Sequence, residues 1–204
     1  TGVQTCALPI CLHPDNPVTM GAFGMPNIFT EAKKAQNEAL LASKEEILKA
    51  WKEMGDITGR YYKPVESYRA EDAETVFLTM GSLGETVSIV VDRLREQGEK
   101  VGQIKLRLWR PFPFQEFRDA VKHVRKIIVL DRAVSYGGPG GPVAGEIRSA
   151  LYREENMPVI VNFVAGLAGR DVKVEDYISM YEKSGQLAKK EVRQEDYTIY
   201  GVRE

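Results

Sequence analysis

Lys126-Ile-Ile-Val-Leu-Asp-Arg-Ala-Val-Ser-Tyr-Gly-Gly-Pro-Gly-Gly-Pro142 is the stretch that decides the fold class of this chain. Its apolar run at residues 127–130 is rich in β-branched residues and is cut off by Asp131-Arg132, which predicts a buried strand. A glycine-rich turn follows, and Pro142 stands where a first helical residue is expected. A helical stripe comes next, formed by Val143, Ile147, Ala150 and Leu151. This is a strand, loop and helix of the parallel α/β kind, in which ligands and partners meet the loops at the carboxyl ends of the strands.

The same alternation recurs on both sides of this stretch. Apolar runs predict further strands at residues 75–80, 101–109 and 159–164, and a helical stripe follows each of them. Right-handed crossovers place the strands that begin at Thr75 and Lys126 side by side at the centre. Residues 61–68, interrupted by a proline, should add an antiparallel edge. The predicted fold class is α/β: a three-layer, doubly wound mixed sheet of five strands with one antiparallel edge, preceded by a long helix.

Two local patterns in the sheet region lead to more detailed expectations. Ser82 and Glu85 have the spacing of a capping box, so we expect Ser82 to cap the helix that follows. In the strand at residues 101–109, apolar residues alternate with Gln103 and Lys105. This alternation predicts one buried face and one face that is wet or meets a partner.

The long helix precedes the sheet. Residues 28–54 place apolar, mostly small side chains at steps of three and four, and Gly55 and Gly59 are expected to end the helix. The favoured interpretation is a surface helix packed on its own domain. The alternative is an arm that lies across a neighbouring domain or subunit.

The ends of the chain complete the predicted domain organisation. Residues 1–10 resemble the translation of a sequencing adapter, and we interpret them as an artefact, so that the remainder would be part of a longer chain. Residues 11–26 are rich in proline and should form a linker. Residues 27–70 would hold the helical arm and edge strand, and residues 71–184 the α/β domain. Residues 185–204 would be a tail whose apolar residues, Tyr197, Ile199 and Tyr200, pack onto a surface elsewhere.

Composition excludes several classes of function. A net charge of −1 over 204 residues argues against a nucleic-acid-binding surface. Cys6, Cys11, His13 and His123 do not have the spacing of a zinc or iron-sulfur site, and two cysteines make no disulfide framework, so a cytoplasmic location is expected. His123 lies off the apolar stripe of its helix and should be exposed rather than catalytic. The longest nearly apolar run, residues 158–168, is too short to span a membrane.

The loops at the carboxyl ends of the predicted strands should gather at one rim of the sheet. Its candidate cofactor-binding residues are Gly81, Ser82, Arg110, Arg132, Gly137, Gly138 and Arg170. This rim lacks a nucleophile with a base, a carboxylate dyad with a histidine, and a metal cluster, so no catalytic or metal-binding residue is assigned. We expect Arg132 and residues 137–141 to face a partner surface. An anion at a helix start is the alternative for residues 81–84 and 137–141, and capping is favoured for the first.

Six motifs occur together and in register along the chain: Pro14-Asp-Asn-Pro-Val-Thr-Met-Gly21, Glu71-Asp-Ala73, Thr79-Met-Gly-Ser82, Leu106-Arg-Leu-Trp-Arg-Pro-Phe-Pro113, Val129-Leu-Asp-Arg132 and Ala165-Gly-Leu-Ala-Gly-Arg-Asp-Val172. Together they make the chain resemble the carboxyl-terminal half of the alpha subunit of pyruvate:ferredoxin oxidoreductase. The resemblance covers nearly all of residues 12–204.

The resemblance implies a fold like the carboxyl-terminal domain of transketolase. It also implies oxidation of a 2-oxoacid with thiamine diphosphate and Mg²⁺, acyl transfer to coenzyme A, and electron flow through 4Fe-4S clusters to ferredoxin. In that family the pyrimidine-binding domain precedes this region, and the diphosphate site and the clusters lie in other domains or subunits. The chain is therefore expected to bind none of these cofactors itself and to contact the beta, gamma and delta subunits as a structural domain.

Two other functions stay open at this point. The chain could play the same part in an enzyme for 2-oxoglutarate or branched-chain 2-oxoacids, because the substrate-contacting domain is not among these motifs. It could also be a stand-alone α/β module that binds a phosphate ligand at residues 81–84 or 137–141.

Overall fold

The computed structural model describes residues 25–188 and 197–203. Its elements are α2 (Pro26–Thr58), β1 (Val65–Tyr68), β2 (Thr75–Thr79), α3 (Leu83–Glu96), β3 (Val101–Leu106), α4 (Phe114–Val121), β4 (Lys126–Asp131), α5 (Pro142–Leu151), β5 (Val159–Val164), a 3₁₀ turn η1 (Leu167–Gly169), α6 (Val174–Leu187) and β6 (Thr198–Ile199). Residues 1–24, which include both cysteines and His13, lie outside the described part of the chain, and so do the expectations made for them.

The chain divides into two compact units, Thr1–Glu46 and Ile47–Glu204, and the division falls within α2. In the first unit, residues 26–46 are helical, and residues 25–42 are exposed throughout. The second unit contains the end of α2 and the whole sheet. This confirms the predicted long helix.

The end of α2 differs from the prediction. Gly55 is buried inside the helix, which continues to Thr58 and ends where Gly59 adopts a φ of +73°. The Tyr61 ring lies against Gly55, where an added Cβ would be 2.5 Å from its Cδ1 atom, and the Tyr61 hydroxyl donates to Asp56 Oδ1 at 2.9 Å. Gly55 is therefore a packing site for an aromatic ring, and only Gly59 supplies the left-handed conformation that ends a helix.

The sheet has six strands in the order β1-β3-β2-β4-β5-β6. Strand β1 is antiparallel to β3, and all other neighbours are parallel. The mixed α/β sheet and the pairing of β2 with β4 at its centre are confirmed, while the predicted number of five strands is wrong.

The sixth strand comes from the tail. Thr198 and Ile199 pair in parallel with Phe163 and Val164, and the Tyr200 N–H donates to the Val164 carbonyl at 2.9 Å. The Tyr200 ring also meets Phe163 edge-on at a centroid distance of 6.3 Å. A two-residue strand carries too little periodicity to be recognised in the sequence, and it forms here because β5 otherwise has an open edge.

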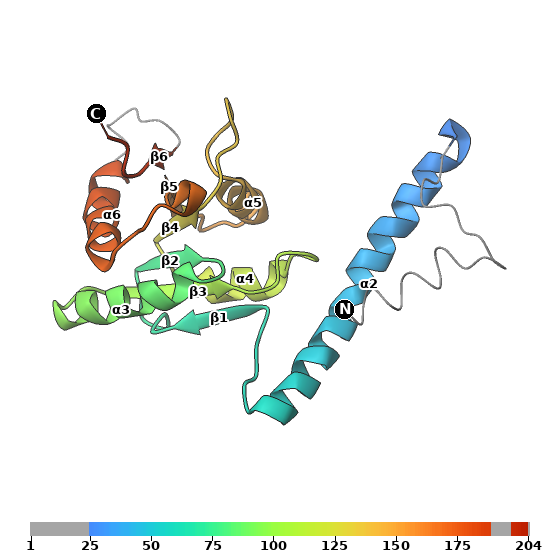
Figure 1. The fold of residues 1–204 in the computed structure, drawn as a ribbon, viewed down its shortest axis with the longest axis horizontal. Helices are drawn as coiled ribbons and strands as arrows, with labels where there is room; N and C mark the ends of the chain where they lie inside the picture. Colours follow the sequence, from blue (N-terminus) through green and yellow to red (C-terminus); the bar gives the residue numbers. More distant parts are fainter. Residues whose placement is uncertain (1–24, 189–196, 204) are drawn as a thin grey trace. The chain divides into compact units, whose positions relative to one another are not determined.

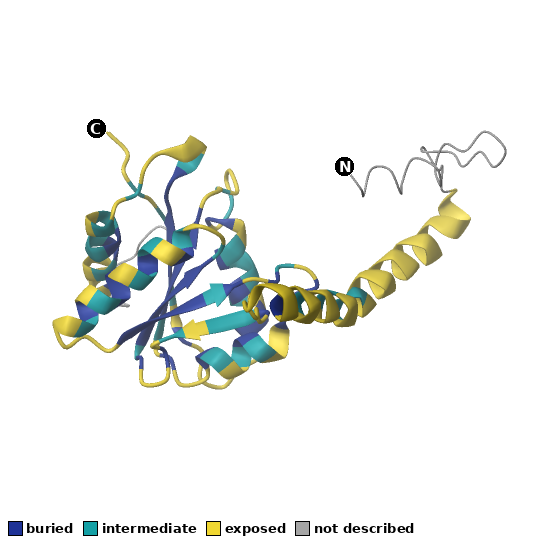
Figure 2. Cartoon of the chain, turned by 60° about the horizontal axis from the view of Figure 1, so that its bottom comes forward, coloured by how far each residue is buried: buried dark blue, intermediate teal, exposed yellow. Residues whose placement is uncertain are grey.

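Helices cover both faces of the sheet and give three layers (Figure 1). Helices α4 and α5 pack on the face that carries Val76, Ile127 and Val129, and helices α3 and α6 pack on the face that carries Phe77 and Ile128. Strand β2 is buried along its entire length, as the dark blue centre of the sheet shows (Figure 2). Successive residues of a strand point to opposite faces, so these continuous apolar runs are what a sheet covered on both sides requires.

The polar face of strand β3 is buried and does not face solvent. The strand ends at Leu106 rather than at residue 109, and Gln103 on the face opposite Ile104 is fully buried. The Gln103 amide donates to Thr79 Oγ1 at 2.9 Å and to the Gly84 carbonyl at 2.8 Å, and its oxygen accepts from Ser88 at 2.9 Å. The expectation of a solvent-facing or partner-facing side was wrong because α3 covers it and satisfies the amide with its own polar groups.

Two smaller expectations concern helix ends. Ser82 precedes α3 but makes no capping bond and has helical backbone angles, while Glu85 pairs with Lys105 Nζ at 3.0 Å. The predicted capping box is therefore absent, because a capping residue has extended backbone angles and its side chain accepts a hydrogen bond from an N–H of the first helical turn. His123 is exposed, as predicted, and its Nε2 atom lies 2.7 Å from the Ala70 carbonyl oxygen.

Candidate functional site: the rim at the carboxyl ends of the strands

A buried aspartate organises the central loop of the rim. Asp131, the last residue of β4, is 1% exposed, and its carboxylate accepts from the N–H groups of Val143 at 2.9 Å and Ala144 at 3.2 Å. Its Oδ2 atom also accepts from the Asn162 side chain at 3.0 Å. These N–H groups belong to the first turn of α5, whose unpaired amides carry partial positive charge. Asp131 is thus the anion at the start of this helix.

Asn162 connects the network to the neighbouring strand. Its Nδ2 group donates to the Val129 carbonyl at 3.2 Å, and its Oδ1 atom accepts from the Gly141 N–H at 2.9 Å. Burial raises the pKa of Asp131, and the three hydrogen bonds to its carboxylate oppose that shift. Asn162 lies within the nearly apolar run at residues 158–168, where the sequence analysis assigned it no role. An asparagine in a buried strand is itself the signal, because a buried amide requires partners.

The glycine-rich loop after β4 is a tight turn of its own. Ser135 and Gly140 form an isolated antiparallel bridge, and the Gly138 N–H donates to the Ser135 carbonyl at 2.9 Å. Gly137 has a φ of +69°. Tyr136 stands beside these glycines with 93% of its surface exposed. Gly137 and Gly138 therefore serve the turn geometry, which presents an aromatic ring to the outside.

The other predicted rim residues separate into distinct surroundings. Gly81 has a φ of +63° between β2 and α3, next to the exposed Ser82. Arg110 is engaged within the chain: its guanidinium lies over the Trp109 ring at 4.5 Å and pairs with Glu146 of α5 at 2.9 Å. Cation–π contact and an ion pair hold this arginine in place, which is a structural use of the residue.

Arg132 and Arg170 come together around one glycine. A Cβ added to Gly166 would be 3.4 Å from the Arg132 Nε atom, and Gly166 and Arg170 line the same cavity. The Arg170 guanidinium donates to the Gly201 carbonyl of the tail. The structure thus gathers two of the seven candidate residues at the end of β5, in what we call the Gly166 turn (residues 165–172).

The backbone of the Gly166 turn includes an alanine in a left-handed conformation. Ala168 has φ 52° and ψ 28°, and it is exposed. An L-residue pays about 1 kcal/mol or more for these angles, whereas glycine adopts them freely. We expect Ala168→Gly to raise the free energy of unfolding by about 1 kcal/mol in urea titrations. Ala133→Gly, at an exposed position without positive φ, serves as the control and should be neutral or slightly destabilising. A destabilised Ala168→Gly protein would contradict this account.

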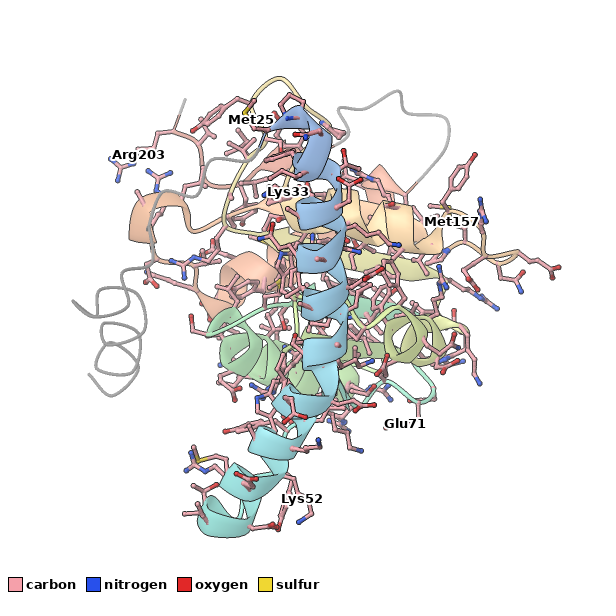
Figure 3. The ribbon with its side chains drawn as sticks, turned by 90° about the vertical axis from the view of Figure 1, so that its right-hand side faces the viewer. Met25, Lys33, Lys52, Glu71, Met157 and Arg203 are labelled. Atoms are coloured by element: carbon pink, nitrogen blue, oxygen red, sulfur yellow. The ribbon has the colours of Figure 1, made fainter. Side chains whose placement is uncertain are left out.

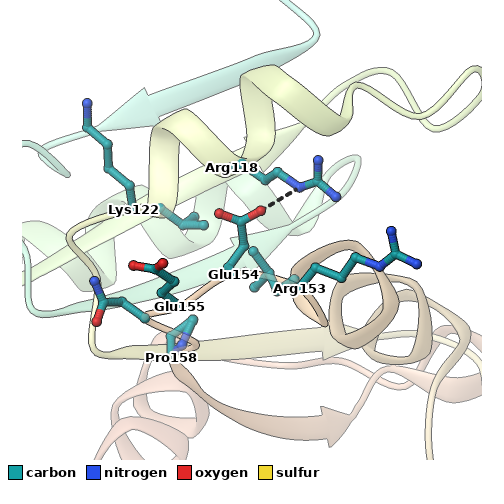
Figure 4. Close-up of a pocket in the computed structure, with 9 residues that line it drawn as sticks. Arg118, Lys122, Arg153, Glu154, Glu155 and Pro158 are labelled. Carbon is teal, nitrogen blue, oxygen red and sulfur yellow. Dashed lines mark ion pairs between the residues drawn. The ribbon is translucent and has the colours of Figure 1, made fainter.

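A separate cavity of about 280 Å³ lies at the opposite, amino-terminal edge of the sheet (Figure 4). Arg118 pairs there with Glu154 at 3.2 Å, and Lys122, Arg153 and Glu155 also line the space. The helices α4 and α5 end beside it, and helix carboxyl ends disfavour anions. Acidic and basic side chains are mixed there, which is typical of an ordinary solvated surface.

Within residues 25–188 and 197–203, no group of three or more His, Cys, Asp or Glu side chains is arranged to hold a metal ion. Over those same residues, none of the helices combines the length and apolarity that crossing a membrane requires.

The chain is similar in sequence to subunits of enzymes that act on 2-oxoacids. The chain is 39% identical over 171 residues to the pyruvate synthase subunit PorA of Thermotoga maritima, which covers 84% of this chain and 43% of the relative. It is 38% identical over 182 residues to the ketoisovalerate oxidoreductase subunit VorA of Pyrococcus horikoshii, with 86% and 46% covered. The chain therefore spans less than half the length of these curated relatives.

A comparison of structures finds a split-gene transketolase at 12% identity with a TM-score of 0.47, covering 64% of this chain and 44% of that one. This TM-score is too low to establish a common fold. Residues 73–177, slightly more than half of the 204, match the family model described as pyruvate:ferredoxin oxidoreductase core domain II. This chain belongs to the pyruvate:ferredoxin oxidoreductase family.

Proposed function

We propose that this chain is the carboxyl-terminal part of the alpha subunit of a thiamine-diphosphate-dependent 2-oxoacid:ferredoxin oxidoreductase, and that it acts there as a structural and assembly domain. The observation that carries the proposal is the match to core domain II of the family together with 39% identity to a pyruvate synthase subunit. The complete enzyme would convert pyruvate and coenzyme A to acetyl-coenzyme A and CO₂ and reduce ferredoxin in the cytoplasm.

The use of polar groups at the rim supports a structural role. The carboxylate of Asp131 and the amide of Gln103 are both buried, and hydrogen bonds within the chain engage both of them. A thiamine diphosphate site needs oxygen ligands for Mg²⁺ and a pocket for the pyrimidine. The residues found at the described rim do not fit that group. We therefore assign thiamine diphosphate, Mg²⁺, the 4Fe-4S clusters and coenzyme A to other domains and to the beta, gamma and delta subunits.

The order of the strands, with one antiparallel edge strand on an otherwise parallel sheet, suits the carboxyl-terminal domain of transketolase, and we propose that topology for the five strands β1–β5. In such sheets the connections after the parallel strands all open at one edge. The same edge would then meet the neighbouring domain in the complete enzyme.

Two 2-oxoacids are candidates for the substrate of the complete enzyme. Identity to the ketoisovalerate subunit is 38%, against 39% for the pyruvate subunit, so a branched-chain 2-oxoacid is a candidate beside pyruvate. Both assignments give this domain the same structural role. Pyruvate is favoured because several pyruvate synthase subunits are similar to this chain, including one from Methanothermobacter thermautotrophicus at 39% identity.

The proposal predicts the behaviour of a hybrid subunit. In the Thermotoga maritima relative, the matching 171-residue segment would be replaced by that of this chain, and the hybrid produced with the other subunits of that enzyme. We expect the hybrid to enter the complex and to support coenzyme A-dependent reduction of ferredoxin by pyruvate. The isolated chain should show no saturable heat with thiamine diphosphate and Mg²⁺ in calorimetry.

Two results would count against the proposal. If circular dichroism shows that the hybrid is folded but it does not enter the complex, the proposed assembly role is wrong. Micromolar binding of thiamine diphosphate to the isolated chain at physiological salt would show that part of the cofactor site lies here. The native relative, produced in parallel, is the control for both measurements.

A further inference from the structure

Three arginines converge on the Gly166 turn from different parts of the chain. Arg132 follows β4 and lies beside Gly166, while Arg170 follows η1. Arg203 belongs to the tail and lines one cavity together with Gly166 and Arg170. Its side chain points outward from the α/β unit, on the side opposite Met157 (Figure 3). The three positive charges therefore share one surface although 71 positions separate the first from the last.

These arginines differ from others of the same unit in their partners. Arg69, Arg95 and Arg110 pair with carboxylates at 2.7, 2.6 and 2.9 Å. Within residues 25–188 and 197–203, neither Arg132, Arg170 nor Arg203 has a carboxylate within ion-pair distance. Arginine is the side chain best suited to bidentate pairing with carboxylates at an interface, so this surface offers capacity that the described chain does not use.

The other charges around the turn leave it positive. The Asp176 carboxylate accepts from the backbone N–H of Lys173 at 2.8 Å and from the Tyr200 hydroxyl at 3.4 Å. Lys183 lies over the Tyr200 ring at 5.0 Å, and Asp171 is exposed next to Arg170. The acidic side chains are thus fewer than the basic ones, and one of them is committed to the start of α6.

The cavity beside these arginines is lined mainly by apolar groups. It measures about 460 Å³, and its walls include Leu167, Ile199, Tyr200 and Val202. Ile199 is 40% exposed and Val202 65% exposed. Arginine and tyrosine around an apolar centre are the composition of a protein–protein contact.

The backbone of the turn argues against a compact phosphate as the occupant. Phosphate sites of the loop type present free backbone N–H groups to the anion. Here the Gly169 N–H donates to the Gly166 carbonyl at 3.2 Å, and the Arg170 N–H donates to the Leu167 carbonyl at 3.0 Å. With these amides used inside the turn, the guanidinium groups and the apolar wall remain as the recognition elements.

We propose that the Gly166 turn and the tail residues 199–203 form a docking surface for a segment of another subunit that carries carboxylate side chains next to apolar ones. This inference rests on the proposed function, since it names the chemistry of a partner in the same complex. The carboxylates would pair with Arg132 and Arg203, and the apolar side chains would enter the cavity beside Ile199. Charge complementarity of this kind accelerates association and makes it sensitive to salt.

The test uses two double variants of the hybrid subunit described above. Arg132→Gln with Arg203→Gln removes two charges from the proposed surface and leaves Arg170, which holds the tail, in place. Lys122→Gln with Arg153→Gln removes two exposed charges from the opposite edge of the sheet and is the matched control. We expect the first variant to bind the remaining subunits at least tenfold more weakly and with a smaller salt dependence, and the control to bind as the parent hybrid does.

Each outcome decides a specific point. If the parent hybrid assembles and the two double variants assemble equally well, the docking surface is wrong while the proposed function stands. An equal loss in both variants would indicate an unspecific effect of net charge and would also overturn the inference. Saturable binding of pyrophosphate that only the first variant loses, without a change in assembly, would assign the arginines to a phosphate ligand instead. A parent hybrid that does not assemble would refute both proposals.

Discussion

Asp131→Ala is expected to lower the free energy of unfolding by about 3 kcal/mol, because it removes a helix cap and leaves buried donors without partners. The N–H groups of Val143 and Ala144 would lose their acceptor at the start of α5. Water does not readily replace it at a site that is 1% exposed. Urea unfolding followed by circular dichroism at neutral pH measures the effect. Asp119→Ala, at an exposed position on α4, should stay within about 0.5 kcal/mol of the parent.

The same variant should change the pH dependence of stability. Burial raises the pKa of Asp131 in the folded protein above its value in the unfolded chain, so the folded state holds the proton more tightly. Proton binding by Asp131 therefore adds stability that is fully present below the unfolded pKa and is lost as pH rises through the folded pKa, while the hydrogen bonds to α5 contribute at neutral pH as well. The difference between parent and Asp131→Ala should grow as pH falls through that window. A difference independent of pH, or a variant as stable as the parent, would contradict the role of the carboxylate.

Gly141→Ala is expected to destabilise the protein by a similar amount, about 3 kcal/mol. A Cβ at this position would overlap the carboxyl group of Asp131. Asp131 cannot move aside without breaking its bonds to α5 and to Asn162, so the strain is not relieved by a simple rotation. The thermal midpoint and the urea midpoint should both fall.

Gly145→Ala is the matched control for this prediction. Gly145 lies inside α5, whereas Gly141 is the extended residue that precedes it, and a Cβ added to Gly145 would meet nothing within 4 Å. Alanine is the better helix former, so this change should raise stability by about 0.5–1 kcal/mol. Opposite signs for two glycine substitutions four residues apart would locate the constraint at the contact with Asp131. Equal effects would contradict the proposed overlap with Asp131, because helix propensity applies to Gly145 and not to the extended Gly141.

The strands of the core could be predicted from the sequence for a definite reason. The β-branched run at residues 127–130 and the run at residues 159–164 have no hydrophobic alternation, which is the pattern of strands covered on both sides. Pro142 at the first helical position also marked the start of α5 correctly. These features are local, because a few consecutive residues determine whether a segment can be a buried strand or a helix start.

The partners of the polar residues could not be predicted in the same way. The alternation in β3 predicts a face for Gln103 that is wet or meets a partner. Gln103 is instead buried against Ser88 and Gly84, because the sequence of β3 does not determine which helix covers it. The strand β6 exists only because residues 198–199 find the open edge of β5. In both cases the deciding contact joins segments that are far apart along the chain.

At the rim, too, the position of the residues follows from the sequence, whereas their contacts follow from the tertiary structure. Sequence alone determined that glycine and arginine gather at the carboxyl ends of the strands, because parallel strands place their following loops at one edge. Tertiary structure decided what each residue does there. The folded chain places Asp131 where it accepts hydrogen bonds from the start of α5, pairs Arg110 with Glu146, and sets Arg132 beside the Gly166 turn. A charge is stabilised or left available by the groups that surround it in space, and those groups become neighbours only when the chain folds.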